Sequence, residues 1–398
     1  MERCQYFVER KKRYCKMTVK KGNKFCGEHM EVSREIPKEK KRVTCPLDNS
    51  HTCYESRLEK HLKVCNAKKI IDAKPEFIVD GINRGNVQEN PERVTLNLLE
   101  DDVVEGIIRR VEAAYEDLPE VQELMLQHDV LDAEVNNPSY GKNTRKHLIQ
   151  NSSILGHIAR AGLAREDTCF IEFGAGKGKL TYWLAQMLKD VDNSTIVLVD
   201  RSSHRNKNDN KLRNEETTVK TIRIRADIGD LVLSKISEIK GIKHKVGIAK
   251  HLCGAATDLT IRCLSQLARD DVNSEVSGLI IAFCCHHRCD YSSYVGKNYL
   301  KTCGFTPEEF PILCSIASWA TCGTGKSREV LNDPTLIVKW EKRESAGRKV
   351  KGLLNWGRIE HLRTLGFDSH LYYYITPEIS LENMCVIATR GKNLEPNI

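Results

Sequence analysis

Apolar runs of strand length alternate with helical patterns through most of the 398-residue chain. The runs that end in a polar turn lie at 168–173, 194–200, 219–228, 245–254 and 277–287, and two more lie at 371–376 and 383–390. Runs separated by helices are typical of parallel strands joined by crossover helices, whereas the last two runs fit an antiparallel pair. The pattern predicts an α/β fold for residues 141–395.

Two segments ahead of the first run carry helical periodicity. From Leu96 to Leu126 the apolar residues fall mostly three or four apart, which predicts an amphipathic helix. A second helix is expected from Thr144 to Ala161. We therefore expect a helical connector at 95–140. Residues 68–94 carry two glycines, two prolines and no sustained period, so we expect a linker there.

Charge and cysteine content distinguish the first 65 residues. They hold 17 Lys and Arg against 9 Asp and Glu, a net charge of +8 that equals the net charge of the whole chain. Six of the 16 cysteines also lie here. The chain shows neither the apolar core of a signal peptide nor a run of about 18 apolar residues. We therefore expect an intracellular protein, located in the cytoplasm or the nucleus, that does not contact a membrane. In such a compartment clustered cysteines bind metal ions more often than they form disulfides.

The first cysteine set has the spacing C-x10-C-x10-C-x2-H, formed by Cys4, Cys15, Cys26 and His29. A segment this short and polar cannot bury enough surface to fold without a cross-link. A tetrahedrally coordinated zinc ion supplies such a cross-link, so we expect a CCCH-type module at 1–32. The alternative is a disordered basic tail. Residues 33–43 resemble a linker, whose KEKKR sequence is either a solvated charge run or a nuclear signal.

The second set is Cys45, His51, His61 and Cys65, with the last two ligands one helical turn apart. Cys53 competes with His51 for the second position. We favour His51, because the pattern then resembles the CHHC zinc finger of RNA-associated proteins. A CHHC-type finger is therefore expected at 43–67, which makes two zinc ions in total.

A glycine-rich turn follows the first strand, with Glu172, Gly174, Gly176 and Gly178 spaced as acidic-x-Gly-x-Gly-x-Gly. A Walker loop needs glycine five residues before Gly178, where this chain has phenylalanine. A dinucleotide turn needs glycine three residues after Gly176, where it has lysine. The remaining pattern resembles the first motif of S-adenosylmethionine-dependent methyltransferases, in a Rossmann-like sheet. Glycines allow close approach of the ligand, and Glu172 can attract its positively charged amino-acid end.

The next two strands end in acidic residues. Asp200 closes the second strand, where an acid meets ribose hydroxyls in such folds. Asp227 closes the third and is followed by Ile228, the positions at which related enzymes enclose adenine. Any one of these could be a surface carboxylate, but their agreement with the glycine turn favours a nucleoside ligand.

Titratable groups gather where the fourth and fifth strands end. Lys250 and His251 end the fourth, and Cys284 and His286 end the fifth. In a doubly wound sheet these ends flank the crevice next to the first strand, so all four are candidate catalytic residues. The motifs of base-methylating enzymes are absent, which favours a hydroxyl acceptor. For the histidines, packing is the alternative role.

Two further features remain open. A third zinc could bind Cys284, Cys285, Cys289, Cys322 and the histidines, although adjacent cysteines after a buried strand usually pack. The basic helix 347–366 could contact phosphates or could simply be solvated; its candidates are Arg348, Lys349, Lys351, Arg358 and Arg363.

Taken together, the CCCH and CHHC sets, EFGAGKG, AKHLCGAATDL and AFCCHHRC resemble the eukaryotic transfer-RNA 2′-O-methyltransferase family that acts on position four of the acceptor stem. The resemblance implies S-adenosylmethionine as methyl donor and the tRNA acceptor stem as partner, with the zinc modules helping to hold RNA. The Lys-Asp-Lys-Glu tetrad of other ribose methylators has no clear match, because Lys250-His251 stands where an aspartate is expected. The general base and the oligomeric state stay open, and the rival interpretation is a non-catalytic RNA-binding protein with a relic methyltransferase fold.

Overall fold

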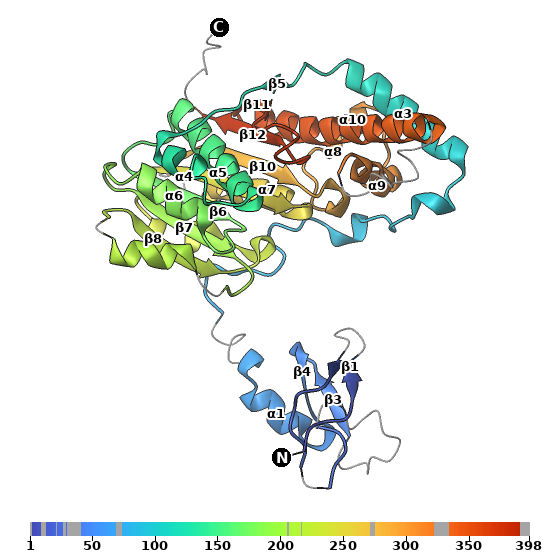
Figure 1. The fold of residues 1–398 in the computed structure, drawn as a ribbon, viewed down its shortest axis with the longest axis vertical. Coiled ribbons are helices and arrows are strands. Elements are labelled where there is room, and N and C mark those ends of the chain that lie inside the picture. Colours follow the sequence, from blue (N-terminus) through green and yellow to red (C-terminus); the bar gives the residue numbers. More distant parts are fainter. Residues whose placement is uncertain are drawn as a thin grey trace. The chain divides into compact units, whose positions relative to one another are not determined.

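The computed structural model describes residues 2–8, 13–20, 22–26, 29, 41–68, 74–204, 207–215, 217–270, 275–321 and 334–390. The chain divides into two compact units, an N-terminal unit Met1–Glu76 and a C-terminal unit Phe77–Ile398 (Figure 1). Each unit has its own sheet structure, so each is described separately.

The N-terminal unit is built from two short antiparallel pairs and one helix. Strand β1 (Phe7–Val8) pairs with β2 (Arg13–Tyr14), and β3 (Arg42–Cys45) pairs with β4 (Asp48–Tyr54). Helix α1 (Leu58–Val64) follows. Most of the described residues that are buried here are cysteines, which leaves little apolar core. This agrees with the expectation that the segment needs a metal to fold.

The C-terminal unit contains a mixed sheet in the order β5-β11-β12-β10-β9-β6-β7-β8. Its strands are β5 (Gln122–Glu123), β6 (Thr168–Phe173), β7 (Thr195–Asp200), β8 (Lys220–Arg225), β9 (His244–Cys253), β10 (Glu275–Cys284), β11 (Asp368–Tyr373) and β12 (Met384–Thr389). Strands β6 to β10 run parallel, and β12 is antiparallel to both of its neighbours. The predicted α/β fold is confirmed, including the closing antiparallel pair. The strand order reverses between β6 and β9, so a crevice is expected at their carboxyl ends.

Helices cover both faces of this sheet. They are α3 (Asp101–Glu116), α4 (Asp132–Val135), α5 (Lys142–Arg160), α6 (Lys179–Met187), α7 (Ala255–Asp270), α8 (Lys297–Thr302), α9 (Phe310–Ala317) and α10 (Pro334–Thr364). Phe170 and Ile248 belong to the core shared with α5 and α6, whereas Ile171, Ala249 and Phe283 belong to the core shared with α7 and α10. Strand side chains therefore alternate between an α5 face and an α10 face. A third core joins α3, α8, α9 and α10.

The helical connector differs from its prediction. The helix expected from Leu96 to Leu126 is α3, which ends at Glu116. Pro119 explains the end, because proline disfavours helical backbone at the residue before it and cannot donate to a helix. The chain then runs into β5, an additional edge strand beside β11. The second expected helix, Thr144 to Ala161, is confirmed as α5.

The second part of the expected linker 68–94 is ordered against the sheet. Ile78 forms a bridge with Leu231, and the side chain of Asn83 donates to the carbonyls of Ile228 and Leu231. Asn83 is buried. Glycine and proline content indicates irregular backbone, but it does not reveal that side-chain amides can anchor such backbone.

A buried ion pair joins α7 to α10. Both guanidinium edges of Arg358 donate to Asp258, with Nε at 3.1 Å from Oδ1 and Nη2 at 2.8 Å from Oδ2. Arg358 also donates to Asn355 and to the thiol of Cys289. Both charged side chains are almost completely buried, 1% and 0% exposed.

Among the described residues, none of the helices combines the length and the apolar character that a membrane span requires.

Candidate functional site

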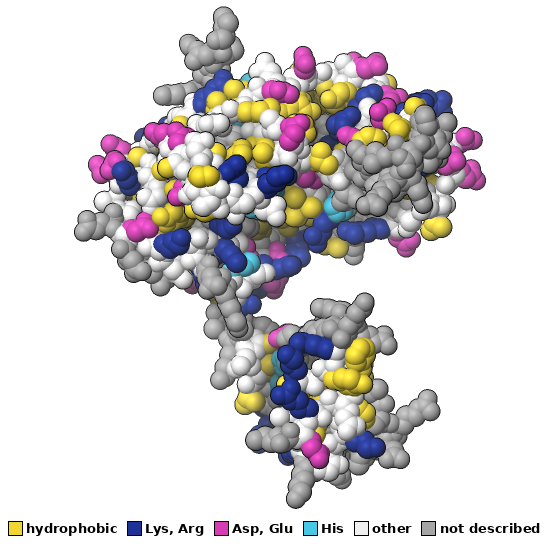
Figure 2. Space-filling model, in the orientation of Figure 1, with side chains coloured by type: hydrophobic (Ala, Val, Ile, Leu, Met, Phe, Trp, Pro, Cys, Tyr) yellow, Lys and Arg dark blue, Asp and Glu magenta, His cyan; other side chains and the backbone are white. Residues whose placement is uncertain are grey.

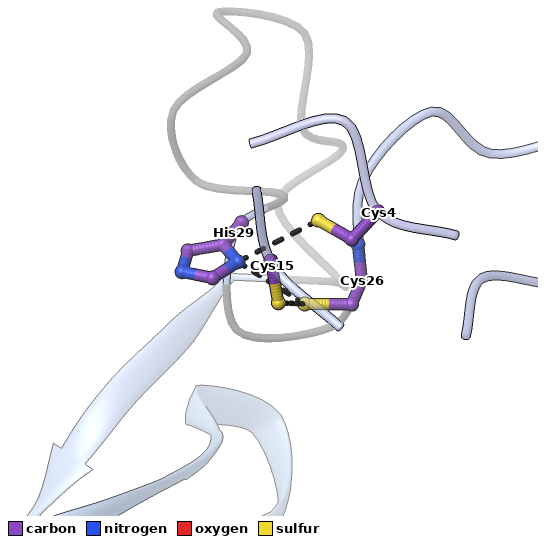
Figure 3. Close-up of side chains that lie close together, drawn as sticks. All are labelled: Cys4, Cys15, Cys26 and His29. Carbon is purple, nitrogen blue, oxygen red and sulfur yellow. Dashed lines mark hydrogen bonds between the residues drawn. The ribbon is translucent and has the colours of Figure 1, made fainter. Parts of the chain in front are cut away.

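The first cysteine set converges in the N-terminal unit (Figure 3). The Sγ atoms of Cys15 and Cys26 lie 3.9 Å apart, and Nδ1 of His29 lies 3.2 Å from Cys26 Sγ and 3.6 Å from Cys4 Sγ. Ligand atoms around zinc with Zn–S bonds near 2.3 Å are about 3.8 Å apart in a tetrahedron. The geometry therefore fits the predicted CCCH zinc site.

The second set also converges. The Sγ atoms of Cys45 and Cys65 lie 3.9 Å apart, and each histidine Nε2 approaches a sulfur, His61 at 3.3 Å from Cys45 and His51 at 3.4 Å from Cys65. Cys53 is not part of this group. His51, and not Cys53, therefore lies with the other three side chains of this set, an arrangement that could hold a metal ion.

Asp48 is an addition that the spacing did not reveal. Its carboxylate lies 3.5 Å from Nδ1 of His51, the ring nitrogen that faces away from the ligand cluster. A carboxylate behind a metal-bound histidine fixes the orientation of the ring and strengthens it as a ligand.

The glycine turn lies between β6 and α6, with left-handed φ angles of +66° at Gly174, +52° at Gly176 and +69° at Gly178. A Cβ on Gly178 would lie 2.7 Å from the carboxylate of Asp209, so only glycine fits there without displacement. A Cβ on Gly176 would meet nothing closer than 4.0 Å, which leaves open space in front of the turn. Oδ2 of Asp200 accepts the Gly176 N–H at 2.7 Å. The glycine turn and Asp200 at the end of β7 are thus adjacent at the same edge of the sheet.

Asp227 and Ile228 lie just beyond β8, at the same edge of the sheet. Oδ1 of Asp227 accepts the Gly229 N–H at 2.9 Å, and Oδ2 lies 3.3 Å from the guanidinium of Arg84. Arg84 comes from the segment that was expected to be a linker, so sequence reasoning missed it. Asp227 is accessible at this edge, but it already has a cationic partner.

Glu172 lies at the base of a cavity of about 250 Å³ beside the glycine turn. Its Oε2 accepts hydrogen bonds from the backbone N–H and the hydroxyl of Thr181 in α6. Burial raises the pKa of Glu172 to about 7, while the Thr181 bonds and the nearby Lys250 oppose that rise. With a pKa of about 7 this carboxyl group is close to its titration point at neutral pH, and a cation bound beside it would favour the charged form.

Lys250 enters the same cavity from β9. Its Nζ donates to Oδ1 of Asn151 and to the carbonyl of His147, both on α5. Burial lowers the pKa of Lys250 to about 8, with Glu172 opposing the shift. The predicted catalytic lysine and the predicted cofactor residues Glu172 and Gly174 thus line one cavity.

His251 occupies a bulge, because Lys250 pairs with Ala282 and Leu252 with Phe283 while His251 has no partner. Its φ is +60°, which is rare for a residue with a Cβ. Its Nε2 lies 2.8 Å from Oε1 of Gln150. Burial lowers the pKa of His251 to about 4, so the ring is neutral near pH 7 and is a weak base.

His286 does not join Lys250. Its Nε2 lies 2.7 Å from Oδ1 of Asn355 on α10, and its ring packs near Phe283 on the α10 face. Lys250 contacts α5 on the opposite face. Burial holds the pKa of His286 well below its ordinary value. The structure therefore separates these two predicted catalytic residues and gives His286 a position inside the α10 interface.

Cys284 belongs to a group of three thiols, Cys253, Cys284 and Cys285, which we call the thiol cluster. This differs from the third metal set considered from sequence. Cys289 accepts a hydrogen bond from Arg358 on the α10 face, and Cys322 lies outside the described residues. Cys253 was missed, although it and Cys284 end adjacent parallel strands in register.

The basic helix 347–366 is the end of α10, and its cations have protein partners. Lys351 is buried and lies 2.7 Å from Glu382, and Arg358 is buried against Asp258. Neither of the two alternatives left open from the sequence fits Lys351 and Arg358, because enclosed side chains are neither solvated nor free to contact phosphates. The other three form surface ion pairs, Arg348 with Glu344, Lys349 with Glu112 and Arg363 with Glu360.

Three family models match the chain. The methyltransferase TRM13 model matches residues 149–389, the CCCH zinc finger in TRM13 protein matches 2–30, and the U11-48K-like CHHC zinc finger matches 42–66. The zinc-finger matches contain both predicted ligand sets. Two segments that the sequence indicated as zinc modules are thus zinc fingers of known kinds.

Curated relatives match along nearly their whole length. The tRNA:m(4)X modification enzyme TRM13 homolog of Mus musculus is 36% identical, covering 97% of this chain and 94% of the relative. The human homolog is 35% identical over 99% and 96%, and the Saccharomyces cerevisiae enzyme TRM13 is 29% identical over 96% and 95%.

Among solved structures, an rRNA methylase from Streptococcus thermophilus matches at 12% identity and a TM-score of 0.29, covering 60% of this chain and 97% of that one. A likeness this low carries no argument, so the fold assignment rests on the strand order and the family models. With one of these models spanning most of the C-terminal unit and relatives aligned end to end, the chain belongs to the TRM13 methyltransferase family.

Proposed function

We propose that this protein methylates the 2′-hydroxyl of a ribose in the tRNA acceptor stem, at position four, with S-adenosylmethionine as methyl donor. Membership of a methyltransferase family supports the reaction class, and the names of its relatives describe tRNA modification. The reaction belongs inside the cell, in cytoplasm or nucleus, where tRNA is present.

One observation carries the proposal. A single cavity is lined by Lys250 from β9, by Glu172 and Gly174 from the β6 end, and by His147 from α5. A lysine amine with a pKa near 8 therefore meets the turn that would hold the cofactor. Methyl transfer to oxygen needs this pairing of an alignment site with a group that can take a proton.

The residues present fit the cofactor. The open space at Gly176 and the left-handed backbone at Gly174 allow a ligand to approach the turn closely. Asp200 would accept hydrogen bonds from its ribose, Asp227 and Ile228 would enclose its adenine, and Glu172 would attract its amino group. When bound, S-adenosylmethionine supplies a methyl group on a positively charged sulfur.

Lys250 is the candidate base. Its neutral amine would accept the 2′-hydroxyl proton while the oxygen attacks, because a group with pKa near the working pH combines basicity with availability. Asn151 holds the amine in place by accepting one of its hydrogens. His251, with a pKa of about 4, is better suited to orient Gln150 than to take the proton.

The N-terminal unit is suited to hold RNA. Figure 2 shows Lys and Arg side chains gathered in a strip on the visible face of this unit. The exposed cations among its described residues are Arg3, Arg13, Lys16, Lys20, Lys24, Lys41, Arg57, Lys60, Lys63 and Lys74. Contacts of Lys and Arg with phosphates supply affinity, and double-stranded RNA is recognised mainly by shape and by its 2′-hydroxyls. Two zinc ions, one in each ligand set, would fold this surface.

The substrate assignment is tested with synthetic tRNA. Two versions are compared, one with 2′-deoxyribose at position four and one with 2′-deoxyribose at position five. Methyl incorporation from labelled S-adenosylmethionine is expected to be lost only with the first, because only that version lacks the accepting oxygen. Equal labelling of the two versions would show that the methyl group goes to another atom.

The proposed base also predicts a pH profile. Titratable groups near Lys250 include Glu172 of β6, His147 of α5, Lys179 of α6 and the adjacent His251. Because protonated amine is inactive as a base, log kcat should rise with a slope of about one up to about pH 8 and then level off. Glu172→Gln removes the charge that favours the protonated amine, so the break should move to lower pH. Single-turnover rates across the pH range measure both, and a flat profile would exclude Lys250 as the base.

A further inference from the structure

We infer that the thiol cluster of Cys253, Cys284 and Cys285 is a third zinc site, in which the three thiolates occupy three of the four positions around the ion. The inference is independent of the proposed ribose methylation. It concerns a group that the two zinc-finger matches, at 2–30 and 42–66, do not include.

The three sulfurs converge on one point at the carboxyl ends of β9 and β10. Cys253 Sγ lies 3.6 Å from Cys284 Sγ, and Cys284 Sγ lies 3.2 Å from Cys285 Sγ. All three lie within 4.8 Å of one another, the same limit that both zinc-finger sets satisfy. Sulfurs that share a zinc ion are about 3.8 Å apart, so the Cys284–Cys285 pair needs to open by about 0.6 Å and the Cys253–Cys284 pair by about 0.2 Å.

The backbone holds Cys285 in a costly conformation that produces this convergence. Its φ of +50° and ψ of +52° are left-handed, a conformation that residues with a Cβ rarely adopt. Such a conformation persists only where the surroundings hold it in place. Here the Cys285 N–H donates to Oε1 of Glu382 at 3.0 Å. Glu382 in turn lies 2.7 Å from the buried amine of Lys351.

The ligand chemistry selects the ion. Thiolates are soft ligands that favour zinc over magnesium or calcium, which prefer oxygen. Among the residues that the structure describes, no fourth Cys, His, Asp or Glu joins the three thiols. Tetrahedral zinc with three thiolate ligands has a fourth position for a further ligand. Cys253 is exposed, so an ion can reach the cluster from solvent.

Metal content of the full-length protein tests the inference. The protein is loaded with zinc, and loosely bound zinc is then removed. The number of zinc ions per chain is obtained from the zinc concentration, measured by mass spectrometry, and the protein concentration. We expect Cys253→Ser and Cys284→Ser each to carry one zinc ion per chain fewer than the wild type. Cys303→Ser, which changes a half-buried cysteine outside the cluster, should keep the wild-type content.

Cobalt gives a second readout that does not depend on counting. Replacement of zinc by Co²⁺ should produce thiolate charge-transfer absorption that is weaker in Cys253→Ser and unchanged in Cys303→Ser. Because Cys253 is exposed, its replacement is not expected to unfold the protein, and tryptophan fluorescence checks this. Equal zinc content in the wild type and Cys253→Ser would overturn the inference, as would a disulfide between any two of the three cysteines in the zinc-loaded protein.

Discussion

Replacing Lys250 with methionine is expected to lower kcat for methyl transfer by about 10²–10⁴-fold, the usual contribution of a positioned general base. The methionine side chain has similar length and tolerates burial, but it cannot accept a proton. Affinity for S-adenosylmethionine, measured by calorimetry, should change little, because the glycine turn and Asp200 are intact. The effect should therefore appear in the chemical step of a single-turnover reaction and not in cofactor binding.

The matched control is Lys245→Met on the same strand. Lys245 is also buried, but it lies five residues earlier, about 17 Å along β9 and away from the cavity. It should keep near wild-type kcat. If Lys250→Met retains wild-type kcat, or if Lys245→Met loses as much, proton transfer does not depend on Lys250.

Replacing Arg358 with methionine is expected to lower the free energy of unfolding of the C-terminal unit by about 3–5 kcal/mol, because the carboxylate of Asp258 is then buried without its partner. Asp258 is 0% exposed, so solvent cannot compensate. The four tryptophans, Trp183, Trp319, Trp340 and Trp356, all lie in this unit. Their fluorescence during urea unfolding therefore reports on it alone.

Two further variants separate charge from packing. Arg363→Met removes an arginine from the same helix whose partner Glu360 is 40% exposed, and its cost should stay below about 1 kcal/mol. The double variant Asp258→Leu/Arg358→Met removes both buried charges and should recover much of the lost stability. A single Arg358→Met variant as stable as Arg363→Met would contradict a dominant role for the buried pair.

The sequence predicts the parallel strands well because each is a short apolar run bounded by polar residues, and because a glycine turn after such a run has few structural uses. Both zinc sets are also predictable, since cysteine and histidine spacing reflects a local coordination geometry. The end of α3 at Glu116 was missed because apolar residues continue past Pro119, on both sides of the short edge strand β5. Periodicity records which residues are buried, not which element buries them.

The candidate site was predicted in part. Lys250 and the glycine turn meet as expected, but His286 faces α10 because the chain leaves β10 through a left-handed residue, Cys285. Strand alternation gives side-chain direction only while the backbone stays extended. Asn151, His147 and Arg84 carry no local signal, since each reaches the site from a segment distant in sequence. Such residues become visible only when the fold is known.

The bulge at His251 bears on which amino acids this position can tolerate. A left-handed backbone costs a residue with a Cβ on the order of 1–2 kcal/mol relative to glycine. Glycine would thus be the choice if folding alone decided, and β-branched residues would be the worst. The imidazole that stands there instead reaches Gln150 at 2.8 Å. At this position the protein therefore has a lower folding stability than glycine would give it, but it gains a fixed polar contact next to Lys250. Such a compromise is expected where the placement of a side chain matters more than thermal stability.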